Sequence, residues 1–374
     1  MKDLPFTRPT LGDEELAVVA EVLKSGWITT GPKVAQLEQA LETYIGGGVS
    51  ARLFNSATSA LEAVLLAAEI GPGDEVIVPA MSFVATANVV LRTGATPVFV
   101  DVDLHSRVVN ARALEAALTP KTRAVMPVHL CGLAADLQPI YDLAQKHGLL
   151  VLEDAAQAIG TRYRGRQLGS FGNPVVFSFH PNKNMTTIEG GAVACGETAL
   201  VERLQSIRFH GFSPDEQGVM TVEEWGGKMN LPDVCAAVGL EQLRKLDGFN
   251  QKRRSLAGRY FESLPRHPAL LLPVDDAGHS WHMFSVCLDA EQIGMTRAQV
   301  IEDFRQQGIM LGTHYPAIHL FPLYRRMGYG PGDFPAAERI GGQTLTLPLF
   351  PTMEPADVDR VCAHFATLLR RAAA

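Results

Sequence analysis

The chain has 374 residues, of which 47% are hydrophobic and 20% charged, a length and composition that predict a soluble globular protein of two domains. Its formal net charge is −7, and no block of Lys and Arg offsets it, which argues against binding nucleic acid through bulk charge. The N-terminus has no apolar core of the signal-peptide kind, and no apolar run approaches the roughly 20 residues that span a bilayer, so we expect no membrane association and a cytoplasmic location.

Short apolar strands alternate with amphipathic helices over the first half of the chain. Strands are predicted at residues 75–78, 97–100, 124–128, 149–152 and 175–179. Helices are predicted at 58–70 and 136–147, where apolar residues recur at helical spacing. This alternation predicts a mostly parallel sheet covered on both faces, which binds its ligands outside the carboxyl ends of the strands.

The second half has a different pattern. A long helix is predicted from Asp233 to Leu246, followed by a hinge at 247–250. Beyond it we expect a strand at 284–288, a helix at 297–307 capped by Thr296, and a closing helix at 357–369. We therefore predict an N-terminal arm and large domain over residues 1–247 and a smaller α+β domain over residues 248–374.

The five cysteines are scattered along the sequence without a CxxC pair. This spacing favours reduced thiols over a disulfide framework or a zinc site, and no metal is expected.

Two polar residues follow predicted strands of the large domain. Lys183 lies in a polar loop after the strand at 175–179, and Asp154 ends the apolar run that begins at residue 149. A lysine can bond to the aldehyde of pyridoxal 5'-phosphate while an acid bonds to its ring nitrogen, so the pair suggests a site for this cofactor. The simpler interpretations are a solvated surface lysine and an acid that caps a helix.

Taken together, these segments make the chain resemble the DegT/DnrJ/EryC1/StrS family of pyridoxal-phosphate sugar aminotransferases. The resemblance rests on the acid motif at 153–157 and the Lys183 loop, in this order, and extends from residues 25–32 to residues 346–351. It implies the aspartate-aminotransferase (type I) fold and a homodimer with shared active sites. It also implies ping-pong transfer of an amino group from glutamate to a nucleotide-linked keto-sugar, as in amino sugar and polysaccharide biosynthesis.

The resemblance assigns roles around the cofactor ring. Lys183 matches the family's Schiff-base lysine, a role that needs an amine whose pKa is lowered by burial. Asp154 matches the partner of the pyridine nitrogen, and Gln157 matches the glutamine that hydrogen-bonds the phenolic oxygen. Phe83 matches the aromatic residue that stacks on the ring, although a lone Phe is ordinarily a core residue.

A cradle for the cofactor phosphate is expected where the first strong helix begins, because free N–H groups and the helix dipole favour an anion there. The residues that match the family's phosphate contacts are Ala57, Thr58 and Ser178. For Thr58 a simple helix cap is compatible with this role.

A further phosphate ligand in the family comes from the other subunit, in the segment that residues 226–233 fill here. Many members show a Gly-x-Asn-x-Arg pattern, and this chain has Lys228 at the Asn place and Asn230 at the Arg place. The same Lys/Asn pairing occurs in the subgroup that makes 4-amino-4-deoxy-arabinose, which favours a UDP-linked 4-keto sugar. An exposed loop lysine is the alternative interpretation of Lys228.

The resemblance also implies contacts to the substrate sugar. An N-terminal loop would close over the sugar, and two later segments would line the cleft; the residues concerned are Trp27, Thr29, Thr30, His180, His314, Tyr315 and His319. Three of these assignments have a structural alternative: a core aromatic for Trp27, a structural histidine for His180, and a proline-rigidified loop for residues 314–319.

Two other functions are compatible with the same fold. A dehydratase that uses the pyridoxal or pyridoxamine form of the cofactor carries a histidine at the lysine place, so Lys183 argues against it. A non-catalytic regulatory protein would have no need of Lys183, Asp154 and Gln157, so their presence favours the aminotransferase.

Overall fold

The computed structural model describes residues 3–222 and 224–372, and its large domain is built on a mixed sheet. Two four-stranded sheets, ordered β3-β2-β4-β5 and β1-β10-β9-β6, become continuous because β5 (Leu150–Val151) and β6 (Glu153–Asp154) are separated only by Leu152. All neighbouring strands are parallel except that β10 is antiparallel to both β9 and β1. The other strands are β1 Ser50–Phe54, β2 Glu75–Pro79, β3 Thr96–Val100, β4 Thr122–Val125, β9 Val175–Ser178 and β10 Gly191–Cys195.

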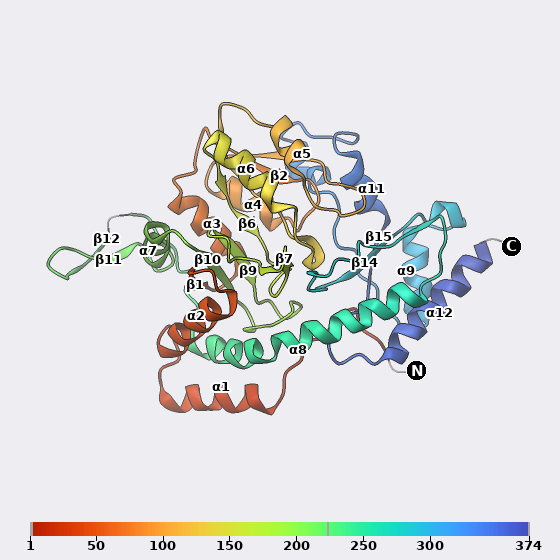
Figure 1. The fold of residues 1–374 in the computed structure, drawn as a ribbon, viewed down its shortest axis with the longest axis horizontal. Helices are drawn as coiled ribbons and strands as arrows, with labels where there is room; N and C mark the ends of the chain where they lie inside the picture. The colour runs from red at the N-terminus through yellow and green to blue at the C-terminus, as the bar shows by residue number, and fades with distance from the viewer. Residues whose placement is uncertain (1–2, 223, 373–374) are drawn as a thin grey trace.

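Helices cover both faces of this sheet, as Figure 1 shows. Consecutive residues Val76, Ile77 and Val78 are all fully buried, as expected for a strand enclosed on both faces. The helices of the large domain are α1 Asp13–Ser25, α2 Pro32–Ile45, α3 Ala57–Ala67, α4 Ala85–Arg92, α5 Ala111–Ala116, α6 Leu137–His147 and α7 Thr198–Ile207. The predicted α/β class and mostly parallel sheet are confirmed.

The long helix α8 (Asp233–Ser263) runs along the base of the molecule in Figure 1. Its first half packs on α1 and α2, and its second half contributes Leu256, Ala257 and Tyr260 to a separate apolar core. The predicted hinge at 247–250 is wrong as a break, because these residues continue the helix. The domain boundary at residue 247 thus falls inside α8 and stays a prediction.

The second core belongs to a smaller α+β unit. Its antiparallel sheet has the order β13-β14-β15, and Leu4 of the N-terminal arm joins the same core through backbone hydrogen bonds to Gly308 and Met310. Thr296 caps α9 as predicted. The elements are β13 Leu270–Leu271, β14 Phe284–Leu288, α9 Arg297–Gln306, β15 Thr344–Leu347 and α12 Pro355–Ala372. Two helices of the same stretch of sequence, α10 Pro322–Arg325 and α11 Pro335–Gln343, instead pack Tyr324, Ala337 and Ile340 into the core of the large domain.

The remaining elements are short. A hairpin of β11 (Phe212–Pro214) and β12 (Met220–Val222) projects from the large domain at the left of Figure 1. The others are β7 Arg162–Tyr163, β8 Arg166–Gln167, and the 3₁₀ turns Leu130–Gly132, Glu291–Ile293 and Ile318–Leu320. Within residues 3–222 and 224–372, none of the helices has the length and apolar character needed to cross a membrane.

Candidate active site

A pocket of about 450 Å³ lies beyond the carboxyl ends of β2, β6 and β9, where ligands of such sheets bind. It brings together most of the residues that the sequence analysis singled out. Those that line it are Ala57, Thr58, Phe83, Asp154, Gln157, Ser178, His180, Lys183, His314 and Tyr315.

Lys183 is delivered to this pocket by the loop between β9 and β10. Its backbone N–H donates to the carbonyl of His180 at 2.8 Å, and the N–H of Thr187 returns to the carbonyl of Phe179 at 3.0 Å, so the loop is folded back on the strand end. Burial lowers the pKa of the Lys183 amine to about 8, while the carboxylate of Asp154 acts in the opposite direction. An amine with this pKa is partly neutral near pH 7–8, as a nucleophile or base requires.

Two donors hold the carboxylate of Asp154. The Thr86 hydroxyl donates to Oδ2 at 2.8 Å, and the backbone N–H of Ala156 donates to Oδ1 at 3.1 Å. The Ser82 hydroxyl in turn bonds Thr86 at 2.7 Å, and all three side chains are buried. Donors to both oxygens fix the orientation of the carboxylate toward the pocket.

Gln157 and Phe83 lie in the pocket wall, and both contact Tyr315. The Gln157 carbonyl oxygen accepts from the backbone N–H of Cys131 at 2.8 Å, and its amide donates to the Tyr315 hydroxyl at 3.2 Å. The ring of Phe83 is 53% exposed and lies 5.7 Å from that of Tyr315, centroid to centroid. Phe83 is therefore not a core residue, since its ring is available to a planar ligand.

The beginning of α3 provides an anion site. Ser56 caps the helix by accepting from the Ser59 N–H at 3.0 Å, and the amides of Ala57 and Thr58 have no hydrogen-bond acceptor in the described part of the chain. Gly191 of β10 packs so closely that a Cβ there would lie 2.4 Å from the Ala57 nitrogen. The turn thus sits directly on the strand end, with free N–H groups beside the pocket.

Two histidines occupy the rim of the pocket. Nδ1 of His314 hydrogen-bonds the Thr346 hydroxyl at 2.8 Å, and burial, with a further contribution from Lys183, lowers the His314 pKa to about 4. His180 is exposed, and its Nδ1 lies 2.8 Å from Oδ1 of Asn182. His314 is accordingly a neutral group at pH 7.

Four predicted residues of the N-terminal loop and the 226–233 segment lie outside this pocket: Thr29, Thr30, Lys228 and Asn230. Thr29 and Asn230 line a second hollow of about 400 Å³, and Lys228 donates to Oδ1 of Asn230 at 2.6 Å and lies 4.8 Å from the centre of the Phe209 ring. This hollow is beside the β11–β12 hairpin, whose Phe212 and Met220 also line it.

The structure also places Trp27 and His319 outside the pocket. Trp27 is 58% exposed, so its interpretation as a core aromatic is wrong. His319 is fully buried, and its Nε2 lies 3.0 Å from a carboxylate oxygen of Glu338. The side chain of His319 therefore packs against Phe334 and Glu338 rather than facing the main pocket.

The sequence analysis gave no role to two residues that the structure brings to the site. Thr86 bonds Asp154, and Glu189 lines the pocket beside Lys183. The available signal for Thr86 was a second hydroxyl residue four positions after Ser82, in the segment that follows β2 and begins α4. Glu189 gave no such signal, since a loop carboxylate is usually solvated.

The residues present fit pyridoxal 5'-phosphate. An amine of lowered pKa, a fixed buried carboxylate, an exposed aromatic face and unpaired N–H groups at a helix start surround one pocket. These are the groups that would hold its aldehyde, ring nitrogen, ring face and phosphate.

Comparisons with known proteins identify the family of this chain. A model of the DegT/DnrJ/EryC1/StrS aminotransferase family matches residues 9–366. The spore coat polysaccharide biosynthesis protein SpsC of Bacillus subtilis is 40% identical over 370 residues, covering 96% of this chain and 95% of SpsC.

Solved structures give the same result. DesV of S. venezuelae, in complex with a ketimine intermediate, superposes with a TM-score of 0.92 at 35% identity and covers 99% of this chain and 100% of its own. NtdA of Bacillus subtilis with bound cofactor PMP has a TM-score of 0.87 at 31% identity, covering 96% of this chain and 82% of NtdA. The predicted type I fold and the predicted cofactor are confirmed.

Proposed function

This chain belongs to the DegT/DnrJ/EryC1/StrS aminotransferase family and is a PLP-dependent sugar aminotransferase, and we propose that it moves an amino group from glutamate to a nucleotide-linked keto-sugar. The observation that carries the proposal is that Lys183 and Asp154 share one pocket with the start of α3. Because SpsC is named for polysaccharide biosynthesis, we assign the product to the same kind of pathway, in the cytoplasm.

Four groups of this chain would hold the cofactor. Asp154 would accept a hydrogen bond from the pyridine N–H, kept in place by Thr86 and the Ala156 amide. The N–H groups of Ala57 and Thr58, with the Ser178 hydroxyl, would bind the phosphate, and the face of Phe83 would lie on the ring. Gln157 would donate to the phenolic oxygen from the amide that now bonds Tyr315.

Lys183 would carry the chemistry. When bound, pyridoxal phosphate supplies a ring that accepts electrons from the carbon whose proton is removed. The Lys183 amine would bond to the aldehyde carbon with loss of the aldehyde oxygen as water. Once the amino substrate has displaced it, the freed amine would take the proton from the donor's α-carbon and give it to the cofactor carbon on the other side of the shared nitrogen. Its pKa of about 8 suits both duties, because the same nitrogen must be neutral to attack and protonated to give the proton back.

The acceptor would enter between the two domains, past the rim formed by His180, His314 and Tyr315. We assign a UDP-linked 4-keto sugar as the first candidate, on the pairing of Lys228 with Asn230. A homodimer would bring the hollow that holds Thr29, Asn230 and the β11–β12 hairpin to the partner's pocket. Several large hydrophobic side chains are exposed in the single subunit, as expected for residues that a partner subunit would bury: Trp27, Phe212, Met220 and Trp225.

The test uses the purified holoenzyme and follows its visible absorption band. Glutamate alone should abolish the band and release 2-oxoglutarate, and aspartate and glutamine serve as comparison donors. A panel of UDP-, dTDP- and GDP-linked 4-keto sugars should then restore the band and yield an amino-sugar of the expected mass. A band that glutamate leaves unchanged, or that only keto-sugars without a nucleotide restore, would contradict the proposal.

A further inference from the structure

Glu189 lies in the wall of the cofactor pocket but takes no part in holding the cofactor. It belongs to the loop between β9 and β10, and its side chain is 63% exposed. The other acid that lines this pocket in the described part of the chain is Asp154, which is buried and bonded to Thr86. The carboxylate of Glu189 therefore offers acceptor oxygens to a ligand that occupies the open part of the pocket.

The backbone beside Glu189 has an unusual conformation. Ile188 has a φ of +74°, in the left-handed region that a β-branched residue rarely adopts. Two buried threonines hold this turn: the Thr186 hydroxyl accepts from the Ile188 N–H at 2.9 Å, and the Thr187 hydroxyl donates to the Glu189 carbonyl at 2.7 Å. Strain of this kind persists where the surrounding structure enforces it. Its result here is that Glu189 lines the pocket while Ile188 does not.

His180 faces Glu189 within the same pocket. Its Nε2 lies 3.9 Å from Oε1 of Glu189, and both side chains are at least half exposed. The other edge of the ring is occupied, because Nδ1 lies 3.3 Å from the backbone nitrogen of Asn182. The separation of 3.9 Å exceeds the roughly 3.2 Å limit of a direct hydrogen bond. A hydroxyl group about 2.8 Å from each atom fits between them, since it can donate to the carboxylate and accept from an imidazole N–H.

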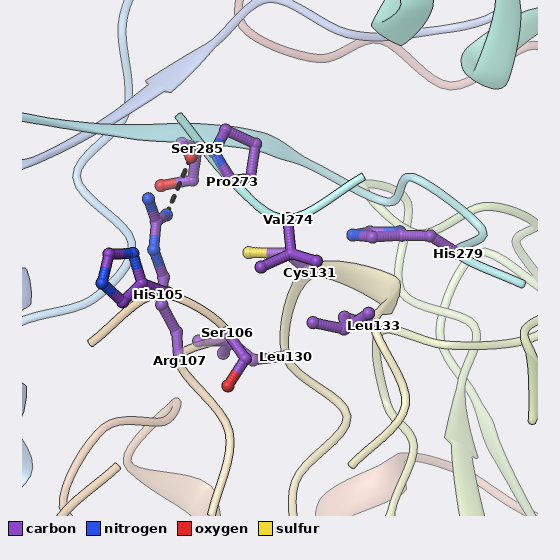
Figure 2. Close-up of a pocket in the computed structure, with 10 residues that line it drawn as sticks. All are labelled: His105, Ser106, Arg107, Leu130, Cys131, Leu133, Pro273, Val274, His279 and Ser285. Atoms are coloured by element: carbon purple, nitrogen blue, oxygen red, sulfur yellow. Dashed lines mark hydrogen bonds between the residues drawn. The ribbon is translucent and has the colours of Figure 1, made fainter. Parts of the chain in front are cut away.

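The opposite side of the site is closed to a sugar. Figure 2 shows the turn at 130–133, which supports Gln157 through the Cys131 N–H, packed against the Arg107 loop and the segments at 273–274 and 279–285. Arg107 donates to the Ser285 carbonyl at 2.8 Å beside a cavity of about 20 Å³, which has room for about one water molecule. A sugar therefore reaches the cofactor pocket from its open side, where the exposed residues of the wall lie.

We propose that Glu189 and His180 bind one ring hydroxyl of the acceptor between them, so that Glu189 selects a hydroxylated keto-sugar; this inference rests on the proposed function. The hydroxyl donates to Oε1 of Glu189 and accepts from Nε2 of His180. An exposed glutamate is negatively charged at pH 7. Its charge repels 2-oxoglutarate, which carries two carboxylates, and thus favours the sugar over the return of the keto acid.

The two half-reactions of the holoenzyme, each followed by absorbance, test this selection in one variant. For Glu189→Gln, kcat/KM for the keto-sugar should fall about 10- to 100-fold, as expected for a lost hydrogen bond to a charged group. The glutamate half-reaction should become roughly two- to fivefold faster at low glutamate, because a like charge is removed. Glu202→Gln, which changes an exposed carboxylate of α7, should match the wild type in both. An equal fall in both half-reactions of Glu189→Gln, or no change in either, would overturn the proposal.

Deoxy analogues of the acceptor test the hydroxyl itself. With the wild type, one monodeoxy form of the accepted keto-sugar should react about 10- to 100-fold more slowly than its parent, and Glu189→Gln should lose most of this difference. If the wild type accepts a keto-sugar and Glu189→Gln discriminates among its deoxy forms equally well, this inference fails alone. If the wild type accepts no keto-sugar, the proposed function fails and the inference falls with it.

A crystal structure of the holoenzyme shows the contact directly. The ligand is the accepted nucleotide sugar with a hydroxyl in place of its keto group, which cannot react. One ring hydroxyl should lie within about 3.2 Å of both Glu189 Oε1 and His180 Nε2. A carboxylate of Glu189 that bonds a side chain of the partner subunit instead, with no sugar oxygen near it, would refute the assignment.

Discussion

The Thr86 hydroxyl donates a hydrogen bond of 2.8 Å to Oδ2 of Asp154, and both side chains are buried. Thr86 belongs to α4 and Asp154 to β6, so this bond joins a helix to the strand end that carries the acid. A threonine hydroxyl has one hydrogen to give. The orientation of the carboxylate therefore depends on a residue that does not line the main pocket.

Replacing Thr86 by valine keeps the shape of the side chain and removes this donor. We expect the rate at which glutamate abolishes the cofactor band to fall by about 10- to 100-fold, the equivalent of roughly 1.4–2.7 kcal/mol for a lost bond to a buried charge. Thr86→Ser retains the hydroxyl and should stay near the wild type. A valine variant as fast as the serine variant would show that Asp154 needs no such support.

The pKa of Lys183 predicts how the cofactor-free enzyme takes up pyridoxal phosphate. The reaction needs the neutral amine, and burial lowers its pKa from the usual 10.5 to about 8. The uptake rate, followed by absorbance, should rise with pH through about 8 and level off above it. Asp154→Asn removes the charge that opposes this shift, so its midpoint should lie at lower pH than that of the wild type. A wild-type rate that still rises tenfold per pH unit above 9 would contradict this assignment.

Gly191 is predicted to be essential for the phosphate turn. A Cβ at this position would lie 2.4 Å from the Ala57 nitrogen and 2.6 Å from the Ser56 carbonyl carbon, both backbone atoms that cannot move alone. Gly191→Ala should displace the start of α3, cost about 1–3 kcal/mol of unfolding free energy and weaken cofactor binding. Equilibrium dialysis of the cofactor and urea unfolding measure the two effects. Unchanged affinity would mean that the turn moves freely.

Gly248 provides a matched glycine in the interior of α8. A Cβ there meets no atom within 4 Å, and the residue is helical. Gly248→Ala should therefore raise the unfolding free energy by about 0.5–1 kcal/mol without changing activity. Reduced activity in this stabilised variant would indicate that residues 247–250 act as a hinge despite their helical conformation.

The sequence predicted those helices and strands that depend on residues close together in the chain. The periodicity of the first half and the Thr296 cap needed no tertiary information, and both are found in the structure. The hinge at 247–250 was predicted wrongly, because packing on two separate apolar cores carries α8 through these residues. Thr86 could not be assigned a role, because its partner Asp154 is 68 residues away in the sequence.

The proposed shared active sites predict complementation between an inactive variant and a weakened one. Lys183→Ala should abolish turnover without unfolding the protein, because it removes the only group proposed to attack and to move protons. Lys228→Ala should weaken turnover, since Lys228 would face the partner's phosphate site.

In a refolded equimolar mixture of the two variants, half of the dimers are mixed. One of the two sites in a mixed dimer combines the intact Lys183 of one subunit with the intact Lys228 of the other. Activity should then return to about a quarter of the wild-type value. If both lysines served the same subunit, no mixed dimer would gain an intact site from the exchange, and the mixture would show only the average of its two parents.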